Sequence, residues 1–371
     1  MPKIRVLHII KSLGRGGAET LLQETLLFHD KELFEFHCVY FLPWKNQMVK
    51  GIENYGGIVK LIPAKNNIAI IFSVFKIIKY IKDNKIDLIH CHLPWAGFAG
   101  RLVYLIRKIP LIYTEHNIQE RYHGITRFIN RITFKFQTKV IAVSSDVANS
   151  IKKNIKPNLP VVIIPNGINT EYFSRDLLMR ESKRAELNIT GDTVLIGTIA
   201  VFRFQKRLCE WVSLFKKIHE QFPEVRGCII GDGVMKKDIM EHVKKLNMEK
   251  YIFFPGLQSN VLPWLSSFDI FVMTSQFEGL PIALLEAMSS ECAVVSTDAG
   301  GIKEVVRNGK DGFLEKTNEW EKLINPIVYL MQNKKEIETY GKQARVRVSQ
   351  SFSIIQMVNE IELQYQSLLC K

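Results

Sequence analysis

IRVLHIIKSLGRGGAETLLQETLLFH, residues 4–29, is the stretch that decides the fold. It begins with a largely apolar run at 4–10, turns through three glycines and continues as a helical pattern at 18–29. A strand with an apolar pattern on both faces that leads into a helix is the first half of a unit in which helices cover a parallel sheet. The stretch therefore predicts a doubly wound α/β domain.

The same alternation continues along the chain and then restarts. Further strand-like runs in the first half lie at 36–42, 87–92, 110–116, 139–144 and 161–167, with a helical pattern at 70–83. In the second half, strand-like runs lie at 194–201, 225–233, 251–256, 269–275, 292–298 and 312–316, between helical patterns at 209–222, 236–248 and 281–290. The fold class predicted is α/β, with two Rossmann-like doubly wound domains facing each other across a cleft at the carboxyl ends of their strands.

The polar segment 171–192 has no strand signal and is expected to be the linker between the domains. We place an N-terminal acceptor-binding domain at 1–172 and a C-terminal nucleotide-binding domain at 173–350. A C-terminal helix at 351–371 is expected to pack back on the N-terminal domain.

The composition is that of a soluble globular protein. The chain has 371 residues, of which 47% are hydrophobic and 23% charged, and no run of about 18 uncharged apolar residues predicts a membrane span. The first ten residues run directly into a strand pattern, so we do not expect a secretory signal. The cysteines have no metal-ligand or redox spacing and are interpreted as reduced thiols of a cytoplasmic protein: Cys38, Cys91, Cys209, Cys228, Cys292 and Cys370.

The net charge of +13 lies entirely in the first half, because residues 1–170 hold 24 Lys and Arg against 11 Asp and Glu. Such asymmetry indicates an anionic partner. Two segments, 121–139 and 68–82, interleave apolar residues with cations: Arg127, Arg131, Lys135 and Lys139 in the former, and Lys76, Lys79 and Lys82 in the latter. Either these are basic amphipathic helices that lie on anionic lipid, or their apolar residues face the sheet and the cations are solvated. The charge asymmetry favours peripheral membrane contact, and no nucleic-acid motif accompanies the charge.

The glycine-rich loop SLGRGGAET, 12–20, follows the first strand and opens a helix. Gly14, Gly16 and Gly17 allow backbone amides to approach a ligand, and the helix start adds positive character, which suits a phosphate. The alternative is an ordinary strand–helix turn.

The segment SQFEGLPIALLEAMSS, 275–290, is a second candidate anion site. Pro281 fits the first turn of a helix, so Gly279 and Leu280 would present free amides there. Glu278 and Glu286 would repel an anion unless they accept hydrogen bonds from sugar hydroxyls, which indicates a nucleotide sugar. The alternative is a helix start that carries ordinary acidic residues.

Two smaller patterns follow strands. Arg203 and Lys206, in FRFQKR, could neutralise a diphosphate or belong to a solvated loop. In the H-C-H of 90–92, His90 and His92 share one face of a strand and look like a metal or base pair.

Taken in order, these motifs resemble the family 4 retaining glycosyltransferases of the GT-B fold over nearly the whole chain. The series is GGAE near the start, H-x-H at 90–92, TEHN at 114–117, IAVS at 141–144, IPNGIN at 164–169, the basic loop at 203–206, GDG at 231–233, E-G-L-P-x-x-x-x-E at 278–286, DAGGIKEVV at 298–306 and DGFL at 311–314.

The resemblance implies roles for the residues of the second half. Glu278 would contact the transferred sugar and Glu286 the ribose hydroxyls, while Arg203 and Lys206 would grip the diphosphate. The sequence departs from many members of the family at Val201, where those members carry the arginine. We therefore assign that role to Arg203.

The resemblance also implies roles for residues near other strand ends. Gly16 and Gly17 would approach the diphosphate, and His116 would lie at the reaction centre beside the donor sugar. We place His92, Gly300 and Gly301 on the acceptor side. The family needs no bound metal, and no metal or other cofactor is claimed.

The function implied is transfer of a sugar, with retention, from a UDP- or GDP-linked donor to a saccharide or lipid-linked saccharide in surface polysaccharide or glycolipid synthesis. Two alternatives stay open: a nucleotide-sugar 2-epimerase of the same architecture, and a nucleotide-sugar-binding protein without turnover.

Overall fold

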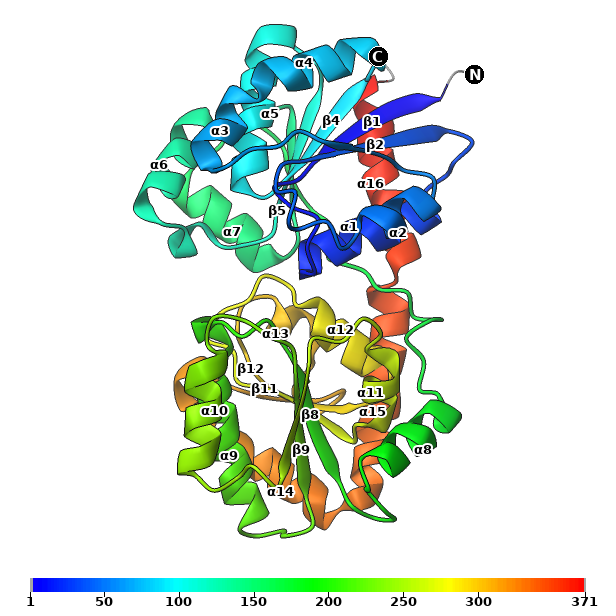
Figure 1. Cartoon of the computed structure of the whole chain (residues 1–371), viewed down its shortest axis with the longest axis vertical. Helices are drawn as coiled ribbons and strands as arrows, with labels where there is room; N and C mark the ends of the chain where they lie inside the picture. The colour runs from blue at the N-terminus through cyan, green and yellow to red at the C-terminus, as the bar shows by residue number, and fades with distance from the viewer. Residues whose placement is uncertain (1–2, 370–371) are drawn as a thin grey trace. The chain divides into compact units, whose positions relative to one another are not determined.

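A computed structural model describes residues 3–369 of the chain, so Cys370 lies outside the described residues. The chain divides into two compact units. The first unit comprises 1–167 together with 354–371, and the second comprises 168–353 (Figure 1).

The first unit is built on a seven-stranded sheet in which every pairing is parallel. The strand order is β3-β2-β1-β4-β5-β6-β7. The strands are β1 (Ile4–Ile9), β2 (Phe34–Tyr40), β3 (Ile58–Leu61), β4 (Leu88–His92), β5 (Leu111–Glu115), β6 (Lys139–Ala142) and β7 (Val161–Ile163). The order reverses between β1 and β4, and ligands of doubly wound sheets bind at such a switch point.

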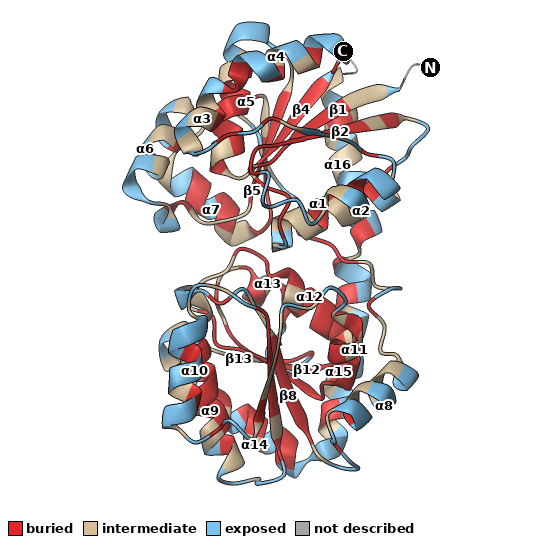
Figure 2. Cartoon of the chain, viewed as in Figure 1, coloured by how far each residue is buried: buried red, intermediate tan, exposed pale blue. Residues whose placement is uncertain are grey.

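Helices connect these strands, as parallel pairing requires. They are α1 (Gly17–Phe28), α2 (Val49–Asn54), α3 (Asn67–Phe72), α4 (Val74–Asp83), α5 (Pro94–Arg107), α6 (Gly124–Thr133) and α7 (Ser145–Asn154), with a short 3₁₀ turn η1 (Gln119–Arg121) and the C-terminal helix α16 (Ile354–Leu369). Every residue of β4 and β5 is buried, including the polar residues His90, His92, Thr114 and Glu115, as expected for central strands of a sheet covered on both faces (Figure 2).

The second unit repeats the plan with a six-stranded parallel sheet of order β10-β9-β8-β11-β12-β13. Its strands are β8 (Leu195–Ile199), β9 (Arg226–Ile230), β10 (Ile252–Gly256), β11 (Ile270–Met273), β12 (Ala293–Thr297) and β13 (Phe313–Glu315). Its switch point lies between β8 and β11. The predicted α/β class with two Rossmann-like domains is thereby confirmed.

Helices surround the sheet of the second unit (Figure 1). They are α8 (Leu177–Glu186), α9 (Leu208–His219), α10 (Lys236–Lys245), α11 (Leu262–Ser267), α12 (Ile282–Ser289), α13 (Ile302–Val305), α14 (Ile324–Gln332) and α15 (Lys334–Ser351), with 3₁₀ turns η2 (Phe204–Lys206) and η3 (Thr317–Leu323). Trp211 and Phe215 of α9 stack within the core of this unit, with ring centroids 5.6 Å apart.

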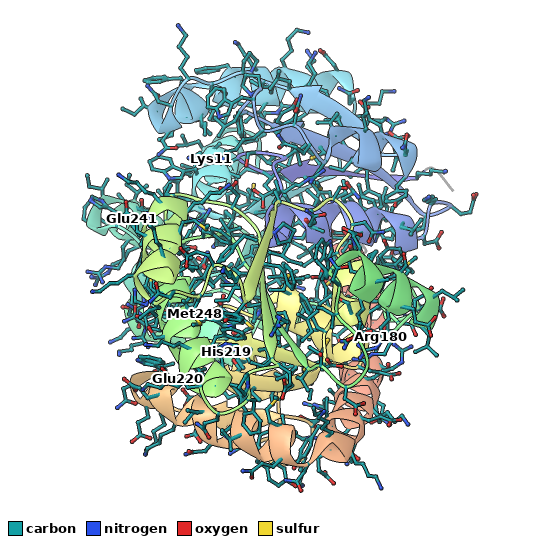
Figure 3. The ribbon with its side chains drawn as sticks, turned by 60° about the horizontal axis from the view of Figure 1, so that its bottom comes forward. Lys11, Arg180, His219, Glu220, Glu241 and Met248 are labelled. Atoms are coloured by element: carbon teal, nitrogen blue, oxygen red, sulfur yellow. The ribbon has the colours of Figure 1, made fainter. Side chains whose placement is uncertain are left out.

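The expected linker at 171–192 is wrong in its placement, because this segment is folded into the second unit. Within it, α8 sends Arg180 and Arg184 to the two oxygens of Asp269, at 2.5 and 3.1 Å (Figure 3 labels Arg180). Both arginines also donate to the carbonyl of Ser267. The polar residues of this segment therefore include side chains that bind the rest of the unit. The chain passes from one unit to the other at 167/168 and again at 353/354.

The C-terminal helix α16 packs within the first unit. Tyr365 is fully buried and its hydroxyl lies 2.7 Å from Nδ1 of His90, while Glu362 lies 2.8 Å from Nδ1 of His29. Side-chain contacts with β4 and α1 therefore fix this helix to the sheet.

Two predicted helices are shorter than the sequence indicates. The pattern at 68–82 is interrupted at Ser73, which separates α3 from α4, and the pattern at 121–139 ends as a helix at Thr133. Lys139 lies in β6 instead, where its Nζ donates to Gln364.

None of the helices within 3–369 is long and apolar enough to cross a bilayer. The five cysteines of that range are free thiols.

Candidate functional site

The switch point of the second unit brings together the loops that follow β8 and β11. The hydroxyl of Thr274 donates to the carbonyls of Lys206 and Arg207, at 3.0 and 2.9 Å. The amide of Gln276 donates to the carbonyl of Gln205 at 2.7 Å. These bonds hold the FRFQKR loop against the SQFEGLP segment, so the basic loop is not a free surface loop.

Lys206 and Glu278 form the centre of this switch point. Nζ of Lys206 donates to Oε1 of Glu278 at 2.5 Å, and the hydroxyl of Ser275 donates to the same oxygen at 2.6 Å. The side chains are only 18% and 11% exposed. A cation and a carboxylate are thus held side by side. The cation is a group that binds phosphate, and the carboxylate is a group that accepts hydrogen bonds from hydroxyls.

Arg203 differs from Lys206 in being exposed. Its side chain makes no hydrogen bond or ion pair within residues 3–369. It precedes η2 by one residue and lies on the same loop as Lys206, so its guanidinium is available to an anionic ligand. Val201, which occupies the position of the family arginine, is 36% exposed.

The start of α12 supplies backbone donors next to Glu278. The helix begins at Ile282, and Pro281, which the sequence pattern placed in the first turn, is its N-cap. Gly279, Leu280 and Pro281 are buried. Glu286 is the single charged residue of α12 and is 8% exposed, which is unusual in a helix buried on nearly every side.

The DAGG loop after β12 packs directly on this segment. The amide of Gly301 donates to the carbonyl of Gly279 at 2.7 Å. Gly300 has φ +58°, and a Cβ there would lie 2.1 Å from the carbonyl oxygen of Glu278. Only glycine therefore fits at 300 without moving Glu278. The two glycines lie beside residues that were assigned to the donor.

In the first unit, Gly16 is the N-cap of α1 and Gly17 its first residue. Gly16 has an ordinary extended backbone, but a Cβ there would lie 2.5 Å from Oε2 of Glu19. Oε1 of Glu19 accepts from the hydroxyl of Ser12 at 3.1 Å. A side chain at position 16 would therefore displace only the flexible carboxylate of Glu19.

His116 follows β5, in a loop held by the buried carboxylate of Glu115. Oε1 of Glu115 accepts from the amides of His116 and Asn117, at 3.1 and 3.3 Å, and from the hydroxyl of Tyr122. Oε2 accepts from Gln119 at 2.6 Å and from Tyr113 at 2.9 Å. This carboxylate was missed by the sequence reasoning, although it stands within the TEHN motif.

The buried surroundings of His116 keep its imidazole neutral. Burial lowers the pKa of His116 to about 4. Its Nε2 is buried without a hydrogen-bond partner within 3–369, and its ring centroid lies 5.9 Å from that of His92.

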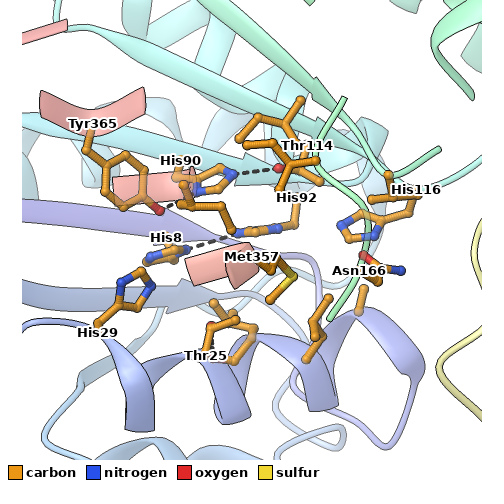
Figure 4. A pocket seen from close by; sticks show the side chains of 17 residues that line it. His8, Thr25, His29, His90, His92, Thr114, His116, Asn166, Met357 and Tyr365 are labelled. Carbon is orange, nitrogen blue, oxygen red and sulfur yellow. Dashed lines mark hydrogen bonds between the residues drawn. The ribbon is translucent and has the colours of Figure 1, made fainter. Parts of the chain in front are cut away.

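His92 belongs to a cluster of histidines under α1 and α16 (Figure 4). Nε2 of His92 lies 3.0 Å from Nδ1 of His8 in β1, and Nε2 of His90 lies 2.7 Å from the hydroxyl of Thr114. Burial, and to a smaller extent the neighbouring imidazoles, lower the pKa of all three rings, that of His90 to about 3. One nitrogen from each of His8, His90 and His92 lies within 4.8 Å of the others, so this trio could hold a metal ion.

Two nitrogen atoms of the cluster are buried without a partner within 3–369, namely Nε2 of His8 and Nδ1 of His92. An unpartnered buried donor or acceptor costs about 1–3 kcal/mol. The cavity that the rings line has a volume of about 30 Å³.

Two parallel Rossmann-like domains, one with a cation–carboxylate pair at its switch point, define the class of GT-B glycosyltransferases. Two family models match the chain: "Glycosyltransferase Family 4" over residues 15–172 and "Glycosyl transferases group 1" over residues 179–347. The chain therefore belongs to the family 4 glycosyltransferases, as the motifs indicated. The comparisons favour sugar transfer over the 2-epimerase alternative.

Individual relatives are distant. UDP-Gal:alpha-D-GlcNAc-diphosphoundecaprenol alpha-1,3-galactosyltransferase of Escherichia coli is 24% identical over 304 residues, which cover 79% of this chain and 78% of the relative. N-acetyl-alpha-D-glucosaminyl L-malate synthase of Bacillus anthracis is 27% identical over 301 residues, again 79% and 78%. The crystal structure of Anabaena Alr3699/HepE in complex with UDP-glucose matches with a TM-score of 0.87 and 19% identity, over 98% of this chain and 100% of that one, which shows the shared fold.

Proposed function

We propose that this glycosyltransferase moves a sugar, with retention of anomeric configuration, from a nucleoside-diphosphate sugar to a saccharide or lipid-linked saccharide. The observation that carries the proposal is the contact between Lys206 and Glu278 at the β8–β11 switch point. A diphosphate needs cations, a sugar needs hydrogen-bond acceptors, and this pair offers both within one ion-pair distance.

On the donor, Arg203, Lys206 and the amides of Gly279 and Leu280 stabilise the diphosphate as it leaves. Glu278 accepts hydrogen bonds from hydroxyls of the transferred sugar, and Glu286 from those of the ribose. Gly16 and Gly17 let the first loop approach the diphosphate. His116, neutral at pH 7, contacts the donor sugar as a hydrogen-bonding group, while His92, Gly300 and Gly301 serve the acceptor side.

The bond from the anomeric carbon to the diphosphate oxygen breaks while the acceptor oxygen bonds to that carbon from the same face. The acceptor proton passes to the leaving phosphate oxygen, so charge and atoms balance without a protein nucleophile. A front-face displacement fits because no carboxylate of the matched motifs is an evident nucleophile, unlike the paired acids of retaining glycosidases.

The relatives support a donor and an acceptor of defined chemistry. The Escherichia coli relative carries UDP-galactose and a diphosphoundecaprenol-linked sugar in its name, and the Anabaena structure contains UDP-glucose. We therefore place a UDP-linked sugar first among donors, ahead of GDP-linked sugars, and a polyprenyl-diphosphate saccharide first among acceptors.

A lipid-linked acceptor calls for contact with a membrane, and exposed apolar side chains of the first unit support it. Phe72 and Phe75, at the junction of α3 and α4, are each 75% exposed, and Phe128 on α6 is 63% exposed. Helix α5 packs against α3, α4 and α6, so the helices that carry these side chains all neighbour α5. Exposed Lys76, Lys79, Lys82, Arg127 and Arg131 accompany them.

This distribution argues against the alternative in which the apolar residues all face the sheet. Ile77 and Ile81 of α4 are buried, whereas Phe72 and Phe75 project to the surface together with the lysines. We propose that this surface lies on the anionic leaflet from the cytoplasmic side, where each basic residue adds about 1 kcal/mol.

The transfer is tested by incubating the chain with UDP- and GDP-linked hexoses and a polyprenyl-diphosphate sugar, followed by NMR of the product. The expected product has the anomeric configuration of the donor. Inverted product would contradict retention, nucleotide release that needs no acceptor would indicate a 2-epimerase, and donor binding without any transfer would indicate a binding protein.

Membrane contact is tested separately by sedimentation with vesicles of phosphatidylglycerol or phosphatidylcholine. Binding is expected to the anionic vesicles and to be lost in Phe72→Ser/Phe75→Ser. Leu178→Ser, at a side chain of the second unit that is 79% exposed, is the matched control and should bind as the wild type does. Equal loss in both variants would contradict the assignment of this surface.

A further inference from the structure

The H-C-H motif at 90–92 is not used by the donor chemistry, yet the structure completes it with a third imidazole. His8 in β1 is paired in register with His90 in β4, and His92 lies two residues further along the same strand. Because side chains alternate along a strand, all three rings project from one face of the sheet. Ring centroids lie 4.3 Å apart for His90 and His92 and 5.1 Å apart for His8 and His90.

These rings stand at the switch point of the first sheet, where β1 and β4 are neighbours and their following connections diverge. Doubly wound sheets bind ligands at this place. The rings are among the residues that line a cavity of about 30 Å³, which has room for at least one ion or water (Figure 4).

The hydrogen bonds of the cluster leave it incomplete. Only one proton can lie between Nδ1 of His8 and Nε2 of His92, which are 3.0 Å apart, so one of these two nitrogens is an unprotonated acceptor. These two facing nitrogens are the ones that an ion between the rings would take, while the opposite nitrogens of both rings are buried and unpartnered within residues 3–369. His90 is oriented from both sides, by Tyr365 and by Thr114, each at 2.7 Å.

We propose that His8, His90 and His92 bind one transition-metal cation of the Zn²⁺ class. Neutral imidazoles are preferred ligands of such ions, and three of them leave a fourth position for water. Zinc–nitrogen bonds of 2.0–2.1 Å set two tetrahedral ligands about 3.3 Å apart, close to the His8–His92 separation.

His90 would exchange one of its two hydrogen bonds for the metal and keep the other as an orienting contact, as metal-bound histidines commonly do. The ion would tie β1 to β4. Where the bond to Tyr365 is the one retained, it would also tie α16 to the sheet.

The test uses the full chain, stripped with a chelator and titrated with Co²⁺ as the spectroscopic probe. The expected result is one Co²⁺ per chain, with visible d–d absorption of a low-coordinate site and affinity at least ten-fold weaker in His8→Asn. The control is His123→Asn, which removes an exposed imidazole and retains a side-chain acceptor for the amide of Ile125. It should bind as the wild type does.

Absence of Co²⁺ binding by the wild type, or equal affinity in both variants, would overturn the proposal. Circular dichroism establishes whether His8→Asn folds. X-ray absorption at the cobalt edge of the wild type decides the matter without any variant, because three imidazole ligands are expected. A spectrum with sulfur ligands, or with fewer than three imidazoles, would overturn the proposal.

Discussion

The two units share one topology but differ in the chemistry at their switch points. At β8–β11 a lysine and a glutamate are held 2.5 Å apart, with an exposed arginine on the same loop. At β1–β4 three buried imidazoles meet, and none of their hydrogen bonds within residues 3–369 goes to a carboxylate. The switch point thus carries charged side chains in the second unit and neutral imidazoles in the first.

The difference follows from the residues at the strand ends. In the second unit, β8 and β11 are followed by loops that contain charged residues, such as Arg203 and Glu278. In the first unit, histidines lie within the strands themselves, where burial lowers their pKa and keeps them uncharged. We infer that the charged switch point serves the diphosphate, whereas the imidazole cluster is suited to a cation.

The largest effect is expected from Lys206→Ala. If Lys206 stabilises the departing diphosphate, kcat should fall about 100- to 1,000-fold, as for removal of one donor to a developing negative charge. Lys216→Ala is the matched control, since Lys216 on α9 pairs with Glu220 at 3.5 Å on the surface. Steady-state kinetics measures both, and equal activity of the two variants would remove Lys206 from the reaction.

Glu286→Gln should weaken donor binding without a comparable loss in kcat. A hydrogen bond to a charged group is worth about 1.5–3 kcal/mol, so KM for the donor should rise about 10- to 100-fold. Glu220→Gln, at the exposed residue that caps the end of α9, should leave KM unchanged. An unaltered KM in Glu286→Gln would show that this glutamate does not bind the ribose.

Gly300→Ala tests whether the DAGG loop positions Glu278. A residue with φ +58° and a Cβ 2.1 Å from the carbonyl of Glu278 forces one loop to move, at a cost of about 1–3 kcal/mol. Gly256→Ala is the control, because Gly256 has φ +74° but open space around its Cβ position. We expect donor KM to rise only in Gly300→Ala, while thermal unfolding midpoints fall in both.

A further prediction concerns pH and the first switch point. The pKa of His90 is lowered to about 3 in the folded chain, against 6.5 when unfolded, so unfolding takes up a proton between those values. The contribution of neutral His90 to the free energy of unfolding is fully present above pH 6.5. It is lost as the pH falls, by about 1.4 kcal/mol per pH unit.

The measurement is urea unfolding in the presence of a chelator, at several pH values between 6.5 and 4. The free energy of unfolding should fall less steeply with decreasing pH in His90→Asn than in the wild type. The difference in slope should correspond to about one proton per chain. If the free energies of unfolding of the two proteins changed equally with pH, the result would contradict a neutral His90.

Much of the fold could be predicted because strands buried on both faces leave continuous apolar runs. The edge strand β3, IVKL, escaped the analysis since it alternates exposed and half-buried residues and is only four residues long. The 171–192 segment was interpreted as a linker because its arginines look solvated. Their partners, Asp269 and the backbone around it, lie about 80–90 residues away in sequence.

The candidate donor site was predictable as a set of residues but not as a set of contacts. The spacing of Glu278 and Glu286 indicated a sugar nucleotide, yet no local pattern shows that Lys206 reaches Glu278 across 72 positions. The role of Gly300 is equally non-local, because it depends on the backbone of Glu278. His8 gave no signal beside H-C-H, since only strand order places β1 next to β4.

Binding of UDP, and separately of GDP, to the wild type and to Lys206→Ala tests the central claim most directly. At a nucleotide concentration of about 100 times Kd, the wild type should gain about 2.7 kcal/mol, seen as a raised thermal midpoint. Lys206→Ala should show a much smaller rise at the same concentration. No shift of the wild type with either nucleotide, or an equal shift in both proteins, would contradict a diphosphate site at β8–β11.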